Sequence, residues 1–298
     1  MDPLIVIFGF GVGVLVGLTG IGGGSLMTPV LILAFGFSPV TAVGTDLAYG
    51  AVTKTVGGWR HLGQRTVHTS LSSWMAIGSV PAAVSGVYVL ELLKRELGHS
   101  FDKVLLAAVA GALLFCGVAV LARALLWPRA GRERDSFQLE PRHKVAAVVM
   151  GIVVGFVLGV TSAGSGSLIA VGLILLFRLA PQRVVGTDIF HAAILLWAAA
   201  IAHMVAGNVD YGLAGTILVG SLPGVVLGSQ WSVRVSGDAL RVALGVVLIG
   251  SGLGIASKAG ASIPPAVIAA APIGVLTVLA LRRAPARPAK ARSVRARS

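Results

Sequence analysis

Charged residues are scarce in this sequence, because Asp, Glu, Lys and Arg make up only 12% of its 298 positions. A water-soluble domain carries about 25% of such residues. Hydrophobic residues account for 56% of the chain, and the mean hydropathy is +0.91. Apolar stretches of membrane-spanning length recur from end to end, so an ordinary soluble domain is excluded and a membrane protein is indicated.

Cysteine is nearly absent. Cys116 stands alone in an apolar run, and one cysteine cannot build a disulfide framework or a thiolate metal site within a single chain. We therefore expect Cys116 to be a small buried residue in a helix. The histidines and acidic residues do not cluster at the spacing of metal ligands, so neither a metal ion nor another cofactor is expected.

Acidic residues are also few, 11 against 24 Lys and Arg, which gives a net charge of +13. Seven of the basic residues lie in the last 17 positions, and most of the others lie between apolar runs. That distribution is typical of topology signals and of contacts with lipid headgroups. We expect the tail to be disordered and to lie on anionic headgroups of the inner leaflet, and we expect no nucleic acid partner.

One stretch occurs twice in the chain. Gly17-Leu-Thr-Gly-Ile-Gly-Gly-Gly-Ser-Leu26 is followed 142 residues later by Gly159-Val-Thr-Ser-Ala-Gly-Ser-Gly-Ser-Leu168. Each copy continues through an apolar run to a proline and then to Gly-Thr-Asp. The copies match at 15 of 30 positions without a gap, and a fixed offset over this length indicates an internal repeat.

The apolar segments predict an all-α, polytopic membrane protein, because a backbone in lipid must satisfy its own hydrogen bonds. The segments that begin at Ser25 and Ser167 would reach only about 18 Å, against roughly 30 Å for a bilayer core. We interpret each glycine-rich break with its flanks as a broken or re-entrant helix. Each repeat then contains an odd number of segments, so the two repeats must be inverted relative to each other.

This interpretation divides the chain into five parts. They are a first transmembrane repeat at 1–128, a cytoplasmic linker at 129–144, a second repeat at 145–257, a further C-terminal helix at 258–281 and the basic tail at 282–298. With the N-terminus outside, 18 Lys and Arg residues fall on the inner side and 4 on the outer side. This split fits the positive-inside rule and predicts a multi-pass protein of the cell membrane with a cytoplasmic C-terminus. A homodimer is compatible with this architecture.

The repeated break has the chemistry of an anion site. Glycines in the middle of a membrane protein leave backbone N–H groups free, which is tolerated only where these groups are buried in protein or line a cavity. A helix that begins after the break points its positive end at it, and serine and threonine add hydroxyl donors. Two inverted copies would converge near the midplane, as in many secondary transporters. Close helix packing is the alternative, and we prefer it for scattered glycines such as Gly9.

The predicted substrate-binding residues belong to the two breaks and to the threonine of each Gly-Thr-Asp. They are Thr19, Gly22, Gly23, Gly24, Ser25 and Thr45 in the first repeat, and Thr161, Ser162, Gly164, Ser165, Gly166, Ser167 and Thr187 in the second. No catalytic residue is predicted.

Asp46 and Asp188 are the acidic residues that the segments place inside spans. A carboxylate in the membrane is costly and marks a function by default. Both are candidates for proton uptake that couples transport, while a role in capping the broken helices stays open. Lys54 lies near the inner end of its segment, and Leu196 stands at the equivalent position, so we expect Lys54 to snorkel to the membrane interface.

A motif in the first repeat resembles the TauE/SafE family, which is related to sulfite and organosulfonate exporters. It consists of Gly-x-Gly-Gly-Gly-x-Leu from Gly20 to Leu26, followed by Pro29, Pro39 and Gly44-Thr45. The second copy departs from the motif with Gly164-Ser165-Gly166 and with Val171 in place of Pro29. The resemblance implies export of a sulfur oxyanion or a sulfonate. The residues alone predict only that the substrate is a small anion.

These observations predict a secondary transporter that moves a small anion, sulfite or an organosulfonate, by alternating access. Two alternatives stay open. One is an anion channel, which the same donors would serve. The other is an intramembrane aspartyl protease with Asp46 and Asp188 as its dyad, which would need the two carboxylates within about 3 Å of each other.

Overall fold

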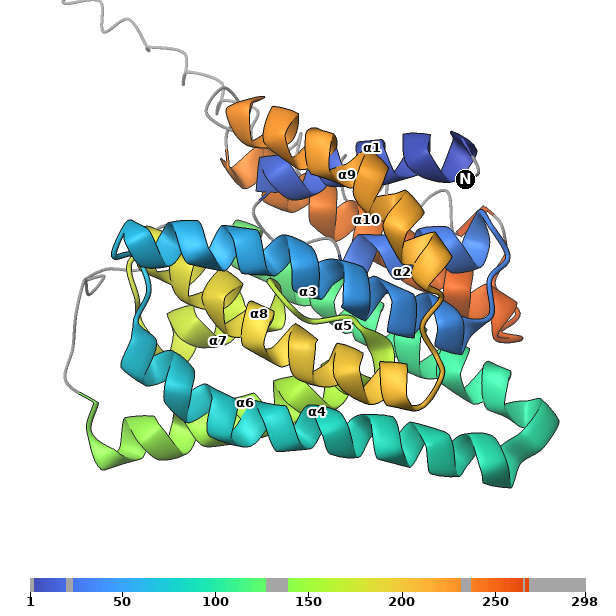
Figure 1. Cartoon of the computed structure of the whole chain (residues 1–298), viewed down its shortest axis with the longest axis horizontal. Helices are drawn as coiled ribbons and strands as arrows, with labels where there is room; N and C mark the ends of the chain where they lie inside the picture. The colour runs from blue at the N-terminus through green and yellow to red at the C-terminus, as the bar shows by residue number, and fades with distance from the viewer. Residues whose placement is uncertain (1–2, 20–23, 127–138, 232–236, 265, 268–298) are drawn as a thin grey trace, which may run out of the picture.

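The computed structural model describes residues 3–19, 24–126, 139–231, 237–264 and 266–267. These parts of the chain are helical and contain no β-strand, which confirms the all-α class (Figure 1). The helices are α1 (Pro3–Thr19), α2 (Gly24–Leu33), α3 (Pro39–Gly63), α4 (Thr69–Leu97), the short η1 (Gly98–Ser100), α5 (Phe101–Leu126), α6 (Pro141–Thr161), α7 (Leu168–Phe177), α8 (Pro181–Val205), α9 (Tyr211–Trp231) and α10 (Gly237–Lys258).

The helices have the length and surface of a membrane protein. Among the described residues, four helical stretches are long and apolar enough to cross a bilayer: Thr69–Ala122, which contains α4 and α5, and Pro141–Thr161, Gln182–Val205 and Tyr211–Trp231. Large apolar side chains face outward, with Phe115 and Ile152 exposed by 64% and 47%. A surface of this kind is stable against lipid and not against water, so the protein is a multi-pass membrane protein.

The two short helices follow the glycine-rich breaks. α2 and α7 have 10 residues each, or about 15 Å at 1.5 Å per residue, so neither can span a bilayer core alone, as the sequence predicts. α6 begins at Pro141, inside the predicted linker, because a proline fits the first turn of a helix. Residues 127–138, most of the predicted segment 263–281 and the tail lie outside the described residues.

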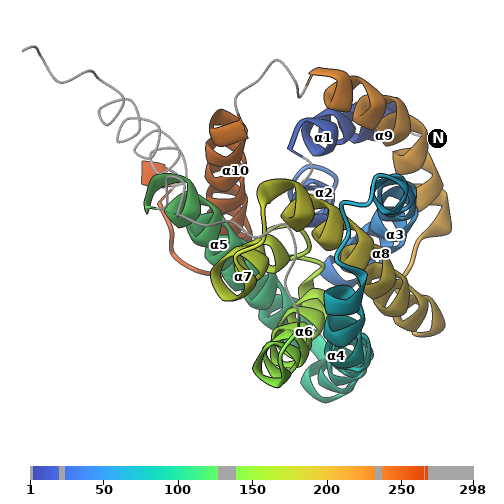
Figure 2. The same ribbon diagram turned by 90° about the vertical axis from the view of Figure 1, so that its left-hand side faces the viewer.

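Helices of the two halves are interleaved. α1 packs along α9 and α4 packs along α6, and Figure 2 shows the two pairs on opposite sides of the molecule. Glycine makes these approaches possible: a Cβ at Gly13 would overlap the backbone of Ser221, and a Cβ at Gly155 would overlap the backbone of Ser79. The two contacts are equivalent under the 142-residue offset. The packing function expected for scattered glycines is therefore present, and Gly9 also lies against α9.

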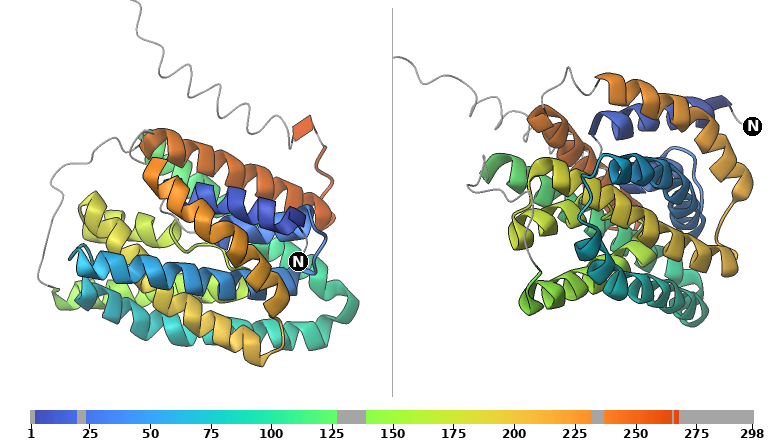
Figure 3. Two further views of the ribbon diagram at one scale, coloured as in Figure 1. Left: turned by 45° about the horizontal axis from the view of Figure 1, so that its top comes forward. Right: turned by 60° about the vertical axis from the view of Figure 1, so that its left-hand side comes forward.

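Helices α3 and α8 lie between these pairs (Figure 3) and run antiparallel to each other. Gly58 lies against Phe190 and Gly50 against Leu196, so residue numbers rise along one helix as they fall along the other. The fifth helices of the two repeats, α5 and α10, also pack antiparallel. These two pairs of corresponding helices thus run in opposite directions, which is the relation that inverted repeats predict.

Candidate functional site

The Gly-Thr-Asp motifs place both aspartates in the central helices. Asp46 is the eighth residue of α3 and Asp188 is the eighth residue of α8. Both are buried, with 0% and 3% of their surface exposed. Burial of a carboxylate is unfavourable unless polar partners replace its water, so the partners of each aspartate identify the surrounding site.

Asp46 joins the two repeats through two hydroxyl groups. Its Oδ2 accepts hydrogen bonds from Thr28 Oγ1 at 2.6 Å and from Ser162 Oγ at 2.9 Å, and the two hydroxyl oxygens are 2.6 Å apart. Thr28 lies in α2, directly after the first break, and Ser162 opens the second break. Asp46 Oδ1 has no hydrogen-bond partner among the described residues, so one acceptor of this buried carboxylate remains available.

The second break turns sharply between α6 and α7. Ser162 has a φ of 57°, and Gly164 and Gly166 have φ of 113° and 89°, values that glycine adopts without the steric penalty of a Cβ. Ser165 and Ser167 are buried, at 0% and 1% exposure. Neither hydroxyl group forms a hydrogen bond of normal geometry within the described parts of the chain, although Ser167 lies near the thiol of Cys116, a weak partner. Buried hydroxyls are nearly always paired, so these two donors point to a missing acceptor.

Two further residues predicted for the second break, Thr161 and Gly164, form hydrogen bonds within the break and its flanking helices. Thr161 Oγ1 donates to the carbonyl oxygen of Val157 at 2.7 Å and accepts from the N–H of Ala163 at 3.3 Å. The carbonyl of Gly164 accepts the N–H of Leu168 at 3.0 Å and so starts α7. These bonds hold the break in one conformation.

Asp188 lies between the break and a lysine. Its Oδ1 accepts the backbone N–H of Gly166 at 3.2 Å, and its Oδ2 is 3.9 Å from Lys54 Nζ. The snorkelling predicted for Lys54 is wrong, because this residue is only 5% exposed. The physical reason is Asp188 on the neighbouring helix α8, which offers the ammonium group a counter-charge inside the protein.

Thr45 and Thr187 have equivalent contacts with the other half of the chain. Thr45 Oγ1 accepts the backbone N–H of Asp210 at 3.0 Å, and Thr187 Oγ1 accepts the backbone N–H of His68 at 2.9 Å. Asp210 and His68 precede α9 and α4 and cap them, by accepting the N–H groups of Leu213 and Leu71. The two threonines therefore anchor helix starts, and contact with substrate stays a prediction.

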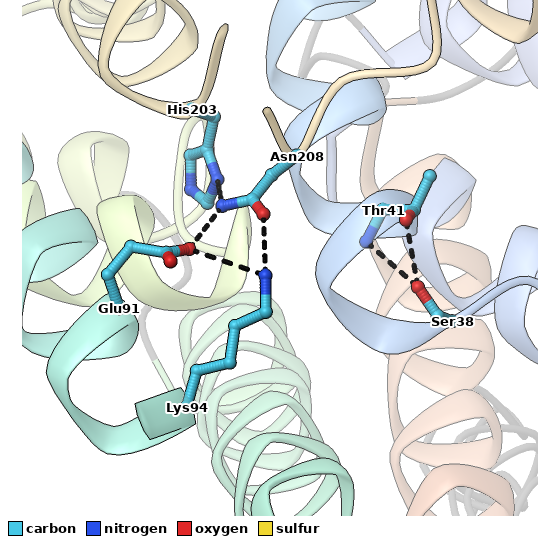
Figure 4. A network of polar contacts seen from close by, with 6 residues as sticks. All are labelled: Ser38, Thr41, Glu91, Lys94, His203 and Asn208. Atoms are coloured by element: carbon cyan, nitrogen blue, oxygen red, sulfur yellow. Dashed lines mark hydrogen bonds and ion pairs between the residues drawn. The ribbon is translucent and has the colours of Figure 1, made fainter. Parts of the chain in front are cut away.

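The loop before α9 is also held by a polar network, which Figure 4 shows. Asn208 Nδ2 donates to Glu91 Oε1 at 2.7 Å and lies 3.3 Å from His203 Nδ1, and Lys94 Nζ donates to Asn208 Oδ1 at 3.4 Å. His203 Nε2 lies 2.9 Å from the carbonyl oxygen of Gly159. The network thus connects this loop to α4 and to the end of α6, beside the second break.

The first break is described only at its edges. Gly22 and Gly23 lie outside the described residues, as does the side chain of Thr19. Gly24 begins α2, and Ser25 is buried with 2% exposure. The bonds from Thr28 to Asp46 and Ser162 bring the first turns of α2 against the second break. No group of three potential metal ligands is found in the part of the chain that the structure describes.

Comparison with known proteins gives a match over nearly the whole chain. The family model "Sulfite exporter TauE/SafE" matches residues 5–255. The chain is 39% identical over 253 residues to "Probable membrane transporter protein YjnA" of Bacillus subtilis (strain 168), covering 85% of this chain and 99% of that protein. It is 24% identical over 261 residues to "Probable membrane transporter protein MJ0441" of Methanocaldococcus jannaschii, covering 83% and 92%. No solved structure is significantly similar to it.

Proposed function

The chain belongs to the TauE/SafE sulfite exporter family and is a membrane transporter, and we propose that it moves a small anion by alternating access. The substrate is a sulfur oxyanion such as sulfite, or an organosulfonate. In the proposed orientation the N-terminus lies outside the cell membrane, and the C-terminus and its basic tail lie at the anionic headgroups of the inner leaflet.

The observation that carries this proposal is the buried second break with its unused donors. Ser165 and Ser167 keep two hydroxyl groups without acceptors in the described structure, and the N–H of Gly166 lies between them in the chain. A small oxyanion has several oxygens that can accept such bonds and replace part of its hydration shell. Ser25, at the start of α2, is the equivalent of Ser167 under the 142-residue offset and supplies the corresponding hydroxyl group of the first repeat.

The charges near the break favour a proton as the coupling ion. Asp46, Asp188 and Lys54 carry a net charge of −1 when all three are ionised, which opposes the entry of an anion into a site of low dielectric. One proton on either carboxylate makes the site neutral. An anion and a proton that enter together therefore avoid this repulsion, and this is the basis for proposing proton-coupled transport.

The partners of the aspartates argue against an intramembrane aspartyl protease. In such a dyad two carboxylates share one proton, whereas here Asp46 accepts bonds from hydroxyl groups and Asp188 pairs with Lys54. A lysine and a hydroxyl-rich glycine break have no role in that reaction. An anion channel would use the same donors, and only transport rate and coupling distinguish it from a transporter.

The proposed function is tested by flux into proteoliposomes that contain the purified full-length chain. Sulfite, sulfate, thiosulfate and sulfoacetate are compared with acetate as a carboxylate control and with protein-free liposomes. We expect saturable flux of at least one sulfur anion. The absence of protein-dependent flux of any of these anions contradicts the proposal, and flux that does not saturate favours a channel.

A further inference from the structure

Lys54 is a buried cation that the repeat does not explain. Its equivalent in the second half is Leu196, which is buried with 1% exposure, so an apolar side chain fills this position of the same architecture. Removing an ammonium group from water carries a large free-energy cost unless strong partners replace the water. A lysine at the interface of α3 and α8 therefore requires a reason beyond packing.

The contacts of Lys54 are weak for a structural ion pair. Its Nζ is 3.9 Å from Asp188 Oδ2, whereas a charge-assisted hydrogen bond closes to roughly 2.7–2.9 Å. An ammonium group has three N–H donors, and Lys54 Nζ has no hydrogen-bond partner among the described residues. The attraction is present, but the hydrogen bonds of a tight pair are not formed.

Asp188 occupies the position that an anion would occupy. Its carboxylate has Lys54 on one side and the N–H of Gly166, in the second break, on the other. A cation and a backbone N–H of a glycine-rich turn are two kinds of group that commonly bind oxyanions in proteins. The unpaired hydroxyls of Ser165 and Ser167 flank Gly166 in the chain, so further donors lie next to this position.

We propose that Lys54 is the residue that binds the anionic substrate, and that the carboxylate of Asp188 is an internal occupant that the substrate displaces. This inference rests on the proposed function and identifies the fixed charge within its site. A substrate with several oxygens bonds to Nζ and to the N–H of Gly166 in place of Asp188. Competition between substrate and carboxylate lowers the apparent affinity, because only the fraction of protein with Lys54 released can bind.

The test uses the purified full-length chain in detergent and measures binding of sulfite by titration calorimetry under nitrogen. Asp188→Asn removes the competing charge but keeps an oxygen for the N–H of Gly166, so sulfite is expected to bind at least about tenfold more tightly than to wild type. Adding Lys54→Leu, the residue of the other repeat, is expected to lose that gain and to bind at least about tenfold more weakly than wild type. Adding Lys54→Arg instead should keep tight binding, because the positive charge remains.

The outcomes separate this inference from the proposed function. If wild type binds sulfite and Asp188→Asn does not tighten binding, the competition is absent and the inference is overturned. It is equally overturned if Asp188→Asn combined with Lys54→Leu binds as tightly as Asp188→Asn alone. If the wild-type chain binds no sulfite and also moves none of the four sulfur anions in the flux experiment, the proposed function fails as well. Thermal unfolding of each variant shows whether a loss of binding reflects a loss of folding.

Discussion

The hydroxyl group of Thr45, in α3, accepts the backbone N–H of Asp210, the residue that begins the turn into α9, at 3.0 Å. The equivalent bond from His68 to Thr187 measures 2.9 Å. Each central helix thus holds the start of a helix of the other repeat. In the proposed alternating-access mechanism the repeats move against each other, and these two bonds connect the repeats.

Replacing Thr45 by valine removes one of these bonds and keeps the shape of the side chain. The partly buried N–H of Asp210 then loses its acceptor, so we expect a loss of stability of about 1 kcal/mol, measured by thermal unfolding in detergent. Thr53→Val is the matched control, because the Thr53 hydroxyl bonds only to carbonyl groups of its own helix. A large loss of anion affinity with unchanged stability would show instead that Thr45 contacts the substrate.

The glycine of each Gly-Thr-Asp lets a loop approach the helix. A Cβ at Gly44 would lie 2.5 Å from the carbonyl oxygen of Asn208, and a Cβ at Gly186 would lie equally close to the hydroxyl of Thr66. Gly44→Ala should therefore destabilise the protein by about 1–3 kcal/mol through overpacking. Gly111→Ala, in α5, meets nothing within 4 Å and should be neutral or slightly stabilising. Equal unfolding temperatures for the two variants would contradict this account.

The proposed inversion of the repeats, with the N-terminus outside, predicts on which side of the membrane each loop lies. Gln64 and Ala206 are equivalent under the 142-residue offset and follow α3 and α8. In a Cys116→Ala background, Gln64→Cys should react with an impermeant thiol reagent only from the cytoplasmic side, and Ala206→Cys only from the outside. Parallel repeats would place both positions on one side, and labelling of both from the same side would refute inversion.

Proton coupling is tested with Asp46→Asn and Asp188→Asn, using sulfite flux in proteoliposomes with and without a pH gradient. We expect the variant that removes the coupling carboxylate to transport at a rate independent of the gradient. The ionisable groups near the two aspartates include Tyr49 and Lys54 on α3, which interact with Asp46 and Asp188, respectively. His191 follows Asp188 by one turn on α8, and its Nε2 lies 3.2 Å from Ser79 Oγ on α4.

Asp210→Asn is the control for this experiment, because Asp210 lies in an exposed loop and asparagine can still cap α9. It should keep the gradient dependence of wild type. If both Asp46→Asn and Asp188→Asn keep it as well, neither carboxylate couples transport to protons.

The helical class and the two short helices could be predicted from the sequence, because hydropathy and glycine density are local properties of the chain. The importance of Gly-Thr-Asp was also visible, since the motif repeats. The roles of its first two residues could not be predicted, because Gly44 and Thr45 contact a loop that lies more than 160 positions away in the chain. Nothing near these residues in the sequence indicates that loop.

Lys54 was misinterpreted for a related reason. Its partner Asp188 lies in the other half of the chain, and the leucine at the equivalent position gives no sign of a charge. A usable signal was nevertheless present: a cation and an acid in separate apolar segments are expected to pair, because each is costly alone in the membrane. Comparison of the two repeats does not reveal a functional residue that is present in only one of them.

The central claim is that a small anion is bound by the donors of the second break, and the hydroxyl groups of Ser165 and Ser167 test it most directly. The measurement is the initial rate of sulfite flux against sulfite concentration, in proteoliposomes with wild type or with Ser165→Ala and Ser167→Ala combined. The account predicts saturable flux for wild type and a half-saturating concentration raised by at least about tenfold in the double variant, since two hydrogen bonds to a charged group are lost. An unchanged half-saturating concentration in a folded double variant would contradict it.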